Sequence, residues 1–306
     1  MSQHPHQTAV ITGATSGIGY ETALALAAQG ITVILACRHP GRMRAAAETI
    51  RSRHPTASID EVALDLGSLT SVRAAAEQIN ARHQHLDILI NNAGIMNTPR
   101  WSTLDGFEMQ FGVNHLGHYA LTMLLLDSLL KAPQARIVTV SSTAHRRART
   151  DIEQWPNPHD YRPARAYAAS KLANTLFAME LHRRLKHAGH SAMSLACHPG
   201  WSSTNLPYAG LRATGRHTAV AVLRVLAALV TQPAAKGALP TLHVATSPDI
   251  DSGSYFGPTQ LAHKRGPAGP EQPAAAAMDP VLGRRLWSLS EELTATEHPA
   301  LAVQVR

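Results

Sequence analysis

The feature that most limits the possible folds is a glycine-rich turn between an apolar run and an amphipathic segment near the N-terminus. Residues 8–12 read TAVIT, residues 13–19 read GATSGIG, and apolar side chains recur at helical spacing over 17–29. Glycines in such a turn allow a phosphate group to approach the backbone, and the following helix presents free N–H groups to an anion. The turn therefore predicts a dinucleotide phosphate site; the alternative, a plain tight strand–helix loop, is disfavoured because the turn follows a strand and opens a helix. The predicted site residues are Gly13, Ser16, Gly17, Ile18 and Gly19.

Short apolar runs alternate with amphipathic segments along the first two thirds of the chain. Strands are expected at 8–12, 31–36, 59–64, 86–90, 135–140 and 191–197, with a last short one near 254–256. Helices are expected at 17–29, 42–53, 68–82, 107–130 and 165–187, and further ones near 218–231 and 234–244. This order predicts an α/β fold: a Rossmann-type doubly wound parallel sheet of about seven strands in a single domain, with helices on both faces. Ligands bind such sheets at the carboxyl ends of the strands.

The domain organisation follows from this pattern. Residues 1–7 are expected to be a disordered tail, 8–262 the dinucleotide-binding domain, and 263–306 a partly helical C-terminal extension, loosely ordered over 266–277. A substrate-binding segment is expected at 201–233, whose apolar side chains line a lipophilic site or belong to the core.

Composition excludes several classes of protein. Hydrophobic residues make up 44% and charged residues 16% of the chain, as in a globular domain with a large core. The net charge of +7 permits acidic partners, but no nucleic-acid-binding motif accompanies it, so no nucleic acid is expected. The apolar stretch 219–230 is too short for a membrane span. Cys37 and Cys197 lie in or beside apolar runs, which indicates buried thiols in a reducing compartment. Residues 1–7 lack the apolar core of a signal peptide. We therefore expect a cytoplasmic location.

The residues after the second and third strands bear on which dinucleotide fits. The second strand leads into Ala36-Cys37-Arg38, without the carboxylate that would hold a ribose 2′-hydroxyl. Arg38 suits a 2′-phosphate, which favours NADP(H) over NAD(H), unless it is a solvated loop arginine. Asp65, followed by Leu66, is expected near the adenine; the alternative is a role at the start of the helix that Ser68 caps.

Tyr167 and Lys171 carry the candidate chemistry. They are four residues apart, so one helical face brings the phenol beside the ammonium. Two cations, Lys171 and an oxidised nicotinamide, would lower the tyrosine pKa and let Tyr167 act as general acid for a carbonyl or general base for an alcohol. Taken alone, this pair is more simply a surface contact. Ser142, however, ends the fifth strand at the same sheet edge, where it can hydrogen-bond the substrate oxygen.

The asparagines near the fourth strand add to this set. Asn92, Ala93 and Gly94 follow the strand and reach the same edge of the sheet. Asn114 lies within the helix expected next, where asparagine is unfavourable. It either has a role at the site or is a buried side chain that bonds its own backbone.

Together these motifs resemble the short-chain dehydrogenase/reductase family. TGATSGIG, NNAG, IVTVSS, YAASK and HPG occur in the order and spacing of that family from about residue 8 to 206, with a weaker similarity at 252–258. The sequences at 36–38, 106–118 and 170–174 resemble its retinol-dehydrogenase-like and protochlorophyllide-reductase-like branch.

The resemblance implies a role for each matching residue. Ser142, Tyr167 and Lys171 would be the catalytic triad, and Asn114 would hold a water that links Lys171 to solvent. Lys171 would also bond the nicotinamide ribose, and Asn92 would shape the floor of the nicotinamide crevice. Pro199, Gly200 and Thr204 would lie against the nicotinamide. The reaction implied is reversible hydride transfer between NADP(H) and a carbonyl or alcohol of a small molecule.

Other functions remain to be compared with this one. Two alternatives are a sensor or scaffold that binds the dinucleotide without turnover, and an epimerase or dehydratase that uses it. The intact set Asn114, Ser142, Tyr167 and Lys171 argues against the first, and the spacing of the glycine turn argues against the second. The 18 histidines show no zinc-ligand spacing, so no metal is expected, and His115 and His118 are interpreted as structural. The resemblance favours a homo-oligomer, a dimer or a tetramer.

Overall fold

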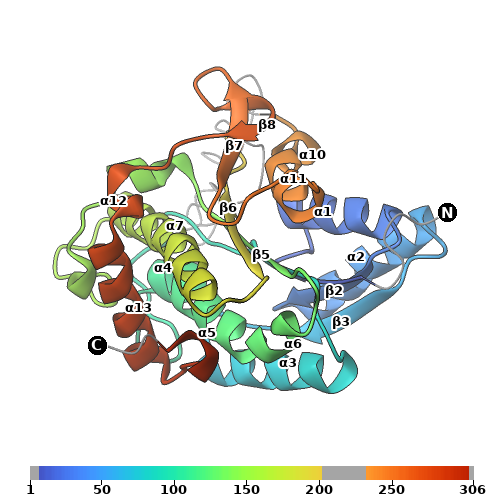
Figure 1. Cartoon of the computed structure of the whole chain (residues 1–306), viewed down its shortest axis with the longest axis horizontal. Coiled ribbons are helices and arrows are strands. Elements are labelled where there is room, and N and C mark those ends of the chain that lie inside the picture. Colours follow the sequence, from blue (N-terminus) through green and yellow to red (C-terminus); the bar gives the residue numbers. More distant parts are fainter. Residues whose placement is uncertain (1–6, 202–231, 303–306) are drawn as a thin grey trace.

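The computed structural model describes residues 7–201 and 232–302, and within them eight strands form one sheet in the order β3-β2-β1-β4-β5-β6-β7-β8. Neighbouring strands from β3 to β7 pair in parallel, and β8 pairs antiparallel with β7 (Figure 1). The strands are β1 (Thr8–Thr12), β2 (Thr32–Cys37), β3 (Ile59–Ala63), β4 (Ile88–Asn91), β5 (Arg136–Val140), β6 (Met193–Cys197), β7 (Tyr255–Gln260) and β8 (Arg265–Pro270). This confirms the expected doubly wound α/β fold.

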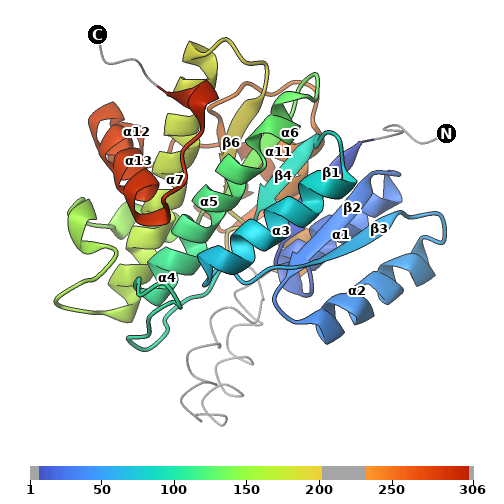
Figure 2. The same ribbon diagram turned by 90° about the horizontal axis from the view of Figure 1, so that it is seen from below.

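Helices cover both faces of the sheet (Figures 1 and 2). One layer holds α1 (Gly17–Ala28), α2 (Pro40–Arg53), α10 (Ala234–Gly237) and α11 (Leu239–Thr246); the other holds α3 (Leu69–Arg82), α5 (Gly117–Leu124), α6 (Leu126–Leu130) and α7 (Pro163–His187). Side chains of successive strand residues point toward opposite helix layers, because a strand repeats every two residues. In β1, Ala9 and Ile11 belong to the core under α1, whereas Val10 belongs to the core under α3 and α5.

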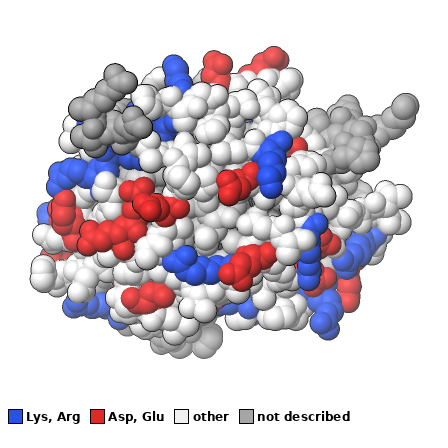
Figure 3. Space-filling view, turned by 60° about the horizontal axis from the view of Figure 1, so that its bottom comes forward, with Lys and Arg blue, Asp and Glu red and all other residues white. Residues whose placement is uncertain are grey.

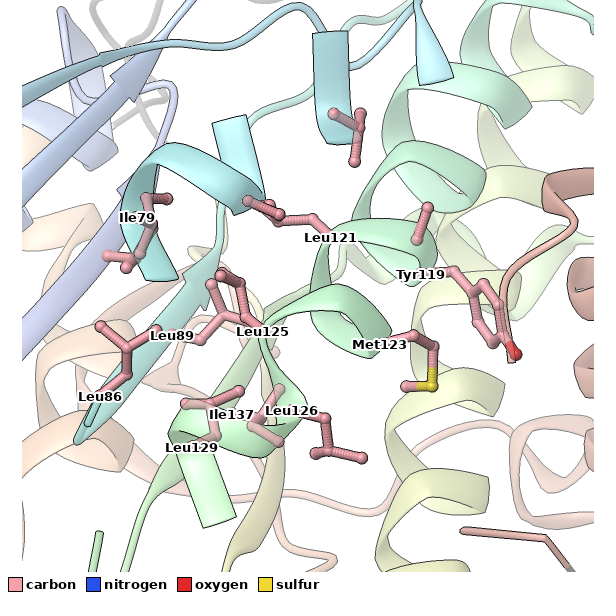
Figure 4. Close-up of a cluster of buried hydrophobic side chains, with 14 of the residues drawn as sticks. Ile79, Leu86, Leu89, Tyr119, Leu121, Met123, Leu125, Leu126, Leu129 and Ile137 are labelled. Atoms are coloured by element: carbon pink, nitrogen blue, oxygen red, sulfur yellow. The ribbon is translucent and has the colours of Figure 1, made fainter. Parts of the chain in front are cut away.

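The core beneath α3, α5 and α6 is closely filled by aliphatic side chains. Figure 4 shows Ile79 of α3, Leu121 of α5 and Leu126 of α6 meeting Leu89 of β4 and Ile137 of β5. All five are fully buried. Burying apolar surface on both faces is what makes these strands continuously apolar in sequence.

The C-terminal helices α12 (Ala275–Met278) and α13 (Pro280–Thr294) lie along the outer side of α7 (Figure 2). Asp279 caps α13 by accepting hydrogen bonds from the N–H groups of Val281 and Leu282. Trp287 of α13 is buried and stacks on Phe177 of α7. The C-terminal helices thus cover α7, the helix that contains Tyr167 and Lys171, although they lie far from it in sequence.

The structure corrects two expectations from the sequence. The single helix expected over 107–130 is four pieces: α4 (Met109–Phe111), a π-helical turn (Gly112–Leu116), α5 and α6. Residues 266–277, expected to be loosely ordered, contain most of β8 and the start of α12, because β8 pairs with β7. This hairpin adds an eighth strand and spans the position at which the C-terminal extension was expected to begin. The helix expected near 218–231 lies outside the described residues.

Among residues 7–201 and 232–302, no helix combines the length and the apolar character that a membrane crossing needs.

The sheet order fixes where a ligand crevice lies. From β1 the chain runs outward to β2 and β3, then returns to β4 on the other side of β1 and continues toward β7. The connections after β1 and β4 therefore diverge, and they leave a crevice at the carboxyl ends of these strands. The glycine turn follows β1, and the Asn92-Ala93-Gly94 segment follows β4, so both motifs border this crevice.

Candidate active site

The glycine turn after β1 has a backbone conformation that favours glycine, and it makes close contacts with the segment after β4. Gly13 and Gly17 have φ of 70° and 58°, in the left-handed region where side chains are disfavoured. A Cβ atom on Gly19 would lie 2.5 Å from Asn92 Nδ2 and 2.6 Å from the Gly13 carbonyl oxygen. The turn is thus a bare-backbone surface packed on the segment after β4.

Hydrogen bonds join these two segments. The Thr12 hydroxyl accepts bonds from the N–H groups of Asn92 and Ala93, each 2.9 Å long, and Asn92 Nδ2 donates to the Thr12 carbonyl at 2.8 Å. Beneath the turn, the Cys37 sulfur accepts a bond from the Ala14 N–H at 3.2 Å. Burial raises the pKa of this thiol to about 11, so it stays protonated. Sequence analysis had assigned Cys37 to the core and missed this contact.

A dinucleotide phosphate suits the start of α1. Ser16 precedes the helix, but its side chain makes no capping hydrogen bond, and the first turn of α1 carries no acidic residue. The N–H groups at Gly17, Ile18 and Gly19 thus meet no competing carboxylate in the first turn of the helix.

Arg38 and Asp65 lie beside this turn, at the ends of neighbouring strands. Arg38 follows β2, is exposed and contacts the His39 ring at 3.4 Å. Asp65 accepts a hydrogen bond from the Gly67 N–H at 2.9 Å, and Ser68 caps α3 as predicted. Asp65 therefore shapes the turn into α3, and Leu66 beside it is buried.

The structure brings Ser142, Tyr167 and Lys171 together at the carboxyl ends of β5 and β6. Ser142 follows β5 and opens a short 3₁₀ turn (Thr143–Arg147), while Tyr167 and Lys171 lie in the first part of α7. Tyr167 shares a side-chain hydrogen bond with Ser142. Lys171 Nζ donates to the Val140 carbonyl at 3.0 Å and lies 5.9 Å from the centre of the Tyr167 ring.

The pKa values of this pair shift in opposite directions. Burial raises the pKa of Tyr167 to about 12, and the bond with Ser142 lowers it only in part. Burial also lowers the pKa of Lys171 to about 8. The lysine was expected to help bring the tyrosine pKa down; in the chain alone the opposite holds, because burial outweighs the other influences on the phenol. Tyr167 is therefore a protonated acid at neutral pH.

Asn114 lies in the π-helical turn and bonds a neighbouring loop instead of its own backbone. Its amide accepts from the Ile95 N–H at 2.8 Å and donates to the Ile95 carbonyl at 3.0 Å and to the Ser170 hydroxyl at 2.9 Å. Gly94 lies between it and the lysine, since a Cβ there would be 3.3 Å from Asn114 Oδ1 and 3.5 Å from Lys171 Nζ. Asn114 thus fixes the loop after β4 against α7. π-helical turns often occur at functional sites.

His118 connects this asparagine to the glycine turn. Its Nδ1 bonds the Asn114 carbonyl at 2.9 Å, and its Nε2 lies 2.8 Å from the Thr12 hydroxyl. Since the Asn114 carbonyl can only accept, the hydrogen of the neutral ring is on Nδ1, and Nε2 is an acceptor for the Thr12 hydroxyl, which also lies 3.3 Å from the Ile90 carbonyl oxygen. Burial lowers the pKa of His118 to about 4 and that of His115, which contacts Ser290 at 2.8 Å, to about 3. Both rings thus form hydrogen bonds within the protein, and in the described ranges no three potential ligands gather as a metal site.

The HPG segment follows β6 and borders the same sheet edge. His198 is fully buried, and the Pro199 carbonyl accepts a hydrogen bond from Gln232 Nε2 at 3.0 Å. The Gly200 N–H donates to His198 Nδ1 at 3.1 Å. Thr204, also expected here, lies outside the described residues, as does most of the substrate segment 201–233.

Two arginines of the polar loop after Ser142 have no carboxylate at salt-bridge distance within the described part of the chain. Arg147 and Arg149 line an open hollow that is also lined by Trp155 and Asp160. Asp160 pairs with Arg162 and Arg165 at 3.2 and 3.1 Å, so the carboxylate neutralises part of the positive charge that lines the hollow. Arg146 of the same loop differs from them, because it bonds the buried carboxylate of Glu271 at 2.7 Å. No sequence motif indicated this contact, because 125 residues separate Arg146 from Glu271.

Charge is otherwise mixed over the surface. On the face drawn in Figure 3, acidic and basic side chains are interspersed without an extensive area of one sign.

Comparisons with known proteins agree with this geometry. A family model described as short chain dehydrogenase matches residues 7–207. Human retinol dehydrogenase 13 is 40% identical, over 98% of this chain and 88% of its own length. An uncharacterized protein from Mycobacterium paratuberculosis has a solved structure that is 42% identical, with a TM-score of 0.79 and 96% of each chain covered. A short-chain dehydrogenase from Escherichia coli CFT073, solved in complex with NADPH, is 25% identical with a TM-score of 0.56, covering 68% of this chain and 82% of its own.

Proposed function

The chain belongs to the short-chain dehydrogenase/reductase family, in its retinol-dehydrogenase-like branch, and we propose that it is an NADP(H)-dependent oxidoreductase of lipophilic carbonyls and alcohols. The observation that carries this proposal is the convergence of Ser142, Tyr167 and Lys171 on the sheet edge that also holds the glycine turn. The NADPH complex of the Escherichia coli relative supports a nicotinamide dinucleotide as the cofactor.

The chain's residues divide into those that hold the dinucleotide and those that handle the proton. Gly13, Gly17 and Gly19 would admit the pyrophosphate, and the exposed guanidinium of Arg38 would bind the 2′-phosphate of NADP(H). Pro199 and Gly200 would lie along the nicotinamide. When bound, the cofactor supplies or accepts a hydride at the substrate carbon.

Proton transfer falls to Tyr167. Its high pKa keeps the phenol protonated, so it can donate to a carbonyl oxygen during reduction. Ser142, bonded to the phenol, would also hydrogen-bond that oxygen. Lys171, whose pKa of about 8 leaves it largely charged at neutral pH, would stabilise the phenolate left after transfer. Asn114 would keep Gly94 and Ile95 in place beside Lys171.

Retinoid-like alcohols and aldehydes are the first substrates to consider, because the relative at 40% identity is a retinol dehydrogenase. The apolar composition of residues 201–233 is compatible with such a substrate. The buried, unpaired thiols of Cys37 and Cys197 support a reducing compartment, and we keep the cytoplasm and a homo-oligomeric assembly as parts of the proposal.

The first experiment is a fluorescence titration with NADPH and NADH, followed by a cofactor-oxidation assay with retinal and other lipophilic aldehydes and ketones. Tight NADPH binding with turnover is the expected result. Binding without turnover over the whole panel would favour the sensor or scaffold alternative. Failure to bind either dinucleotide would contradict the proposed function.

Tyr167→Phe tests the proton-transfer role directly. The variant keeps the ring and loses the hydroxyl, so NADPH affinity should stay within about twofold while turnover falls by roughly 10²–10⁴-fold. Steady-state rates and the NADPH dissociation constant measured together check this. Full turnover in the variant would rule out Tyr167 as the acid.

A further inference from the structure

Glu271 is a buried carboxylate that directly follows β8 and contacts two loops of the candidate active site. Its side chain is 5% exposed. One oxygen accepts a hydrogen bond from Arg146 Nη2 at 2.7 Å, and the other accepts from His198 Nε2 at 2.6 Å. His263 Nδ1 lies 3.1 Å from the second oxygen. Burying a carboxylate charge is costly unless hydrogen-bond donors such as these compensate for the lost water.

The histidine partner reaches the HPG segment through its other ring nitrogen. His198 Nδ1 accepts the Gly200 N–H, so its hydrogen is on Nε2 and is donated to Glu271. The ring thus links the Glu271 carboxylate to the backbone N–H of Gly200 through two hydrogen bonds. The arrangement is of the kind by which a second group orients a histidine and fixes its tautomer.

Residues 271–274, which we call the C-terminal strap, also hold the loop after Ser142. Arg146 donates to the Gln272 carbonyl as well as to Glu271. The Ala274 N–H donates to His145 Nε2 at 3.0 Å, and His145 Nδ1 bonds the Ser142 carbonyl at 2.6 Å. A chain of hydrogen bonds therefore runs from the strap to the backbone of the catalytic serine.

Two further features fit this junction. A Cβ on Gly257 would lie 2.0 Å from His198 Nε2 and 2.6 Å from Glu271 Oε2, so only glycine leaves room for their hydrogen bond. Burial raises the pKa of Glu271, but the bonds from His198 and Arg146 outweigh it and hold the pKa at about 2. The carboxylate is therefore ionised throughout the neutral range.

We propose that Glu271 is a positioning residue that fixes the Pro199–Gly200 segment against the nicotinamide half of the cofactor and the Ser142 loop against Tyr167. The inference rests on the proposed function, because it assigns a partner to the nicotinamide-binding and catalytic segments. Glu271 touches no reacting atom in this scheme; it acts through His198 and Arg146.

Glu271→Gln is the test, with Glu180→Gln as its matched control. Glu180 is equally buried, at 4% exposure, and accepts from Arg183 and Arg184 at 2.9 Å each, but it lies in the second half of α7. Three quantities are measured for each variant and the wild type: the dissociation constant of NADPH, that of adenosine 2′,5′-bisphosphate, which lacks the nicotinamide half, and the turnover of carbonyl reduction.

Glu271→Gln should weaken NADPH about tenfold and lower turnover by about ten- to a hundredfold, because small displacements of reacting groups are costly. Binding of the bisphosphate should not change, since the glycine turn and Arg38 are untouched. The control should retain all three values even if its melting temperature falls. General loosening of the fold would weaken both ligands together and overturn the proposal, as would wild-type values in Glu271→Gln.

Arg146→Met provides a second test if Glu271→Gln does not fold. Arg146 is 41% exposed, so its loss is tolerated more easily. This variant should lower turnover several-fold and leave NADPH affinity unchanged, because only the Ser142 loop is released; unchanged turnover would contradict the proposal. If the wild type itself bound no dinucleotide, the proposed function would fail first, and the two failures are thereby distinguishable.

Discussion

Burial shifts the pKa values of Tyr167 and Lys171 in opposite directions. It disfavours the charged form of each group, so the phenol retains its proton while the ammonium binds its proton less tightly. A neutral tyrosine suits the reductive direction, in which the proton is donated. Alcohol oxidation has the opposite requirement, because the phenol must first be deprotonated.

The two directions should therefore differ in their pH dependence. Turnover of alcohol oxidation should rise as the pH increases from about 6 to about 8, since the phenolate becomes more populated toward a pKa of about 12 while Lys171, with a pKa of about 8, is still at least half charged. Carbonyl reduction should gain nothing over this range. Initial rates in both directions across the same buffers check the sign. An oxidation rate that falls with pH would contradict the assignment.

Arg38→Asp tests the choice of cofactor at a single residue. Loss of a charge-assisted contact to the 2′-phosphate, with a carboxylate in its place, should weaken NADPH by about 10- to 100-fold and NADH far less. Arg53→Asp, at the other end of α2, introduces the same charge change and should leave the NADPH:NADH ratio intact. An unchanged ratio in Arg38→Asp would place the 2′-phosphate elsewhere.

At the scale of secondary-structure elements, the π-helical turn between α4 and α5 is the main departure from the sequence prediction. The apolar periodicity of 107–130 predicts one helix, and no residue type signals that the hydrogen bonds shift register at Gly112–Leu116. The shift accompanies the bond between His118 and the Asn114 carbonyl. Tertiary contacts to Thr12 and Ile95 stabilise this geometry, and they are not visible in local sequence.

Neutral buried histidines in and beside this turn make the fold sensitive to acid. In the folded state His118 has a pKa of about 4, whereas an unfolded histidine titrates near 6.5. The folded pKa is lower, so stability is full above pH 6.5 and is lost as the pH falls toward 4, by on the order of 3 kcal/mol for this residue. Urea unfolding at several pH values checks this. His118→Gln should lose less stability in acid than the wild type, and an equal loss would assign the effect to other groups.

Much of the candidate site was predictable from sequence because its motifs are local. The glycine turn, the asparagines after β4 and the Tyr167–Lys171 spacing each act through neighbouring backbone, and the parallel sheet brings their strand ends together. Glu271, His145 and Cys37 were missed as site-supporting residues. Their contacts join segments far apart in sequence, and their residue types alone carry no signal.

At the scale of the whole molecule, α13 covers the outer side of α7. The Trp287 ring contacts Tyr119 and Phe177, and the Arg184 guanidinium lies 4.3 Å from its centre. Contacts between copies, if the proposed oligomer forms, must therefore use surfaces other than the one under α13. The helix that carries Tyr167 and Lys171 is thus supported on the side away from the sheet by the C-terminal part of the chain.

Trp287→Ala measures that support. Removing this buried ring should lower the free energy of unfolding by about 3–5 kcal/mol, the usual cost of a large core truncation. Trp101→Ala is the control, because Trp101 is 42% exposed and its loss should cost under about 1 kcal/mol. Chemical denaturation of both variants provides the comparison. A loss below about 1 kcal/mol in Trp287→Ala would mean that α13 contributes little to the stability of α7.

The C-terminal strap is synthesised well after the loop that it holds. Arg146 and Glu271 are 125 residues apart, so at roughly 5–20 residues per second the catalytic loop leaves the ribosome about 6–25 seconds before its anchor. The glycine turn and its neighbouring strands can meanwhile assemble from the first part of the chain. A polypeptide terminated before residue 271 would then contain the glycine turn, Ser142, Tyr167 and Lys171 but lack the strap that holds the loop after Ser142.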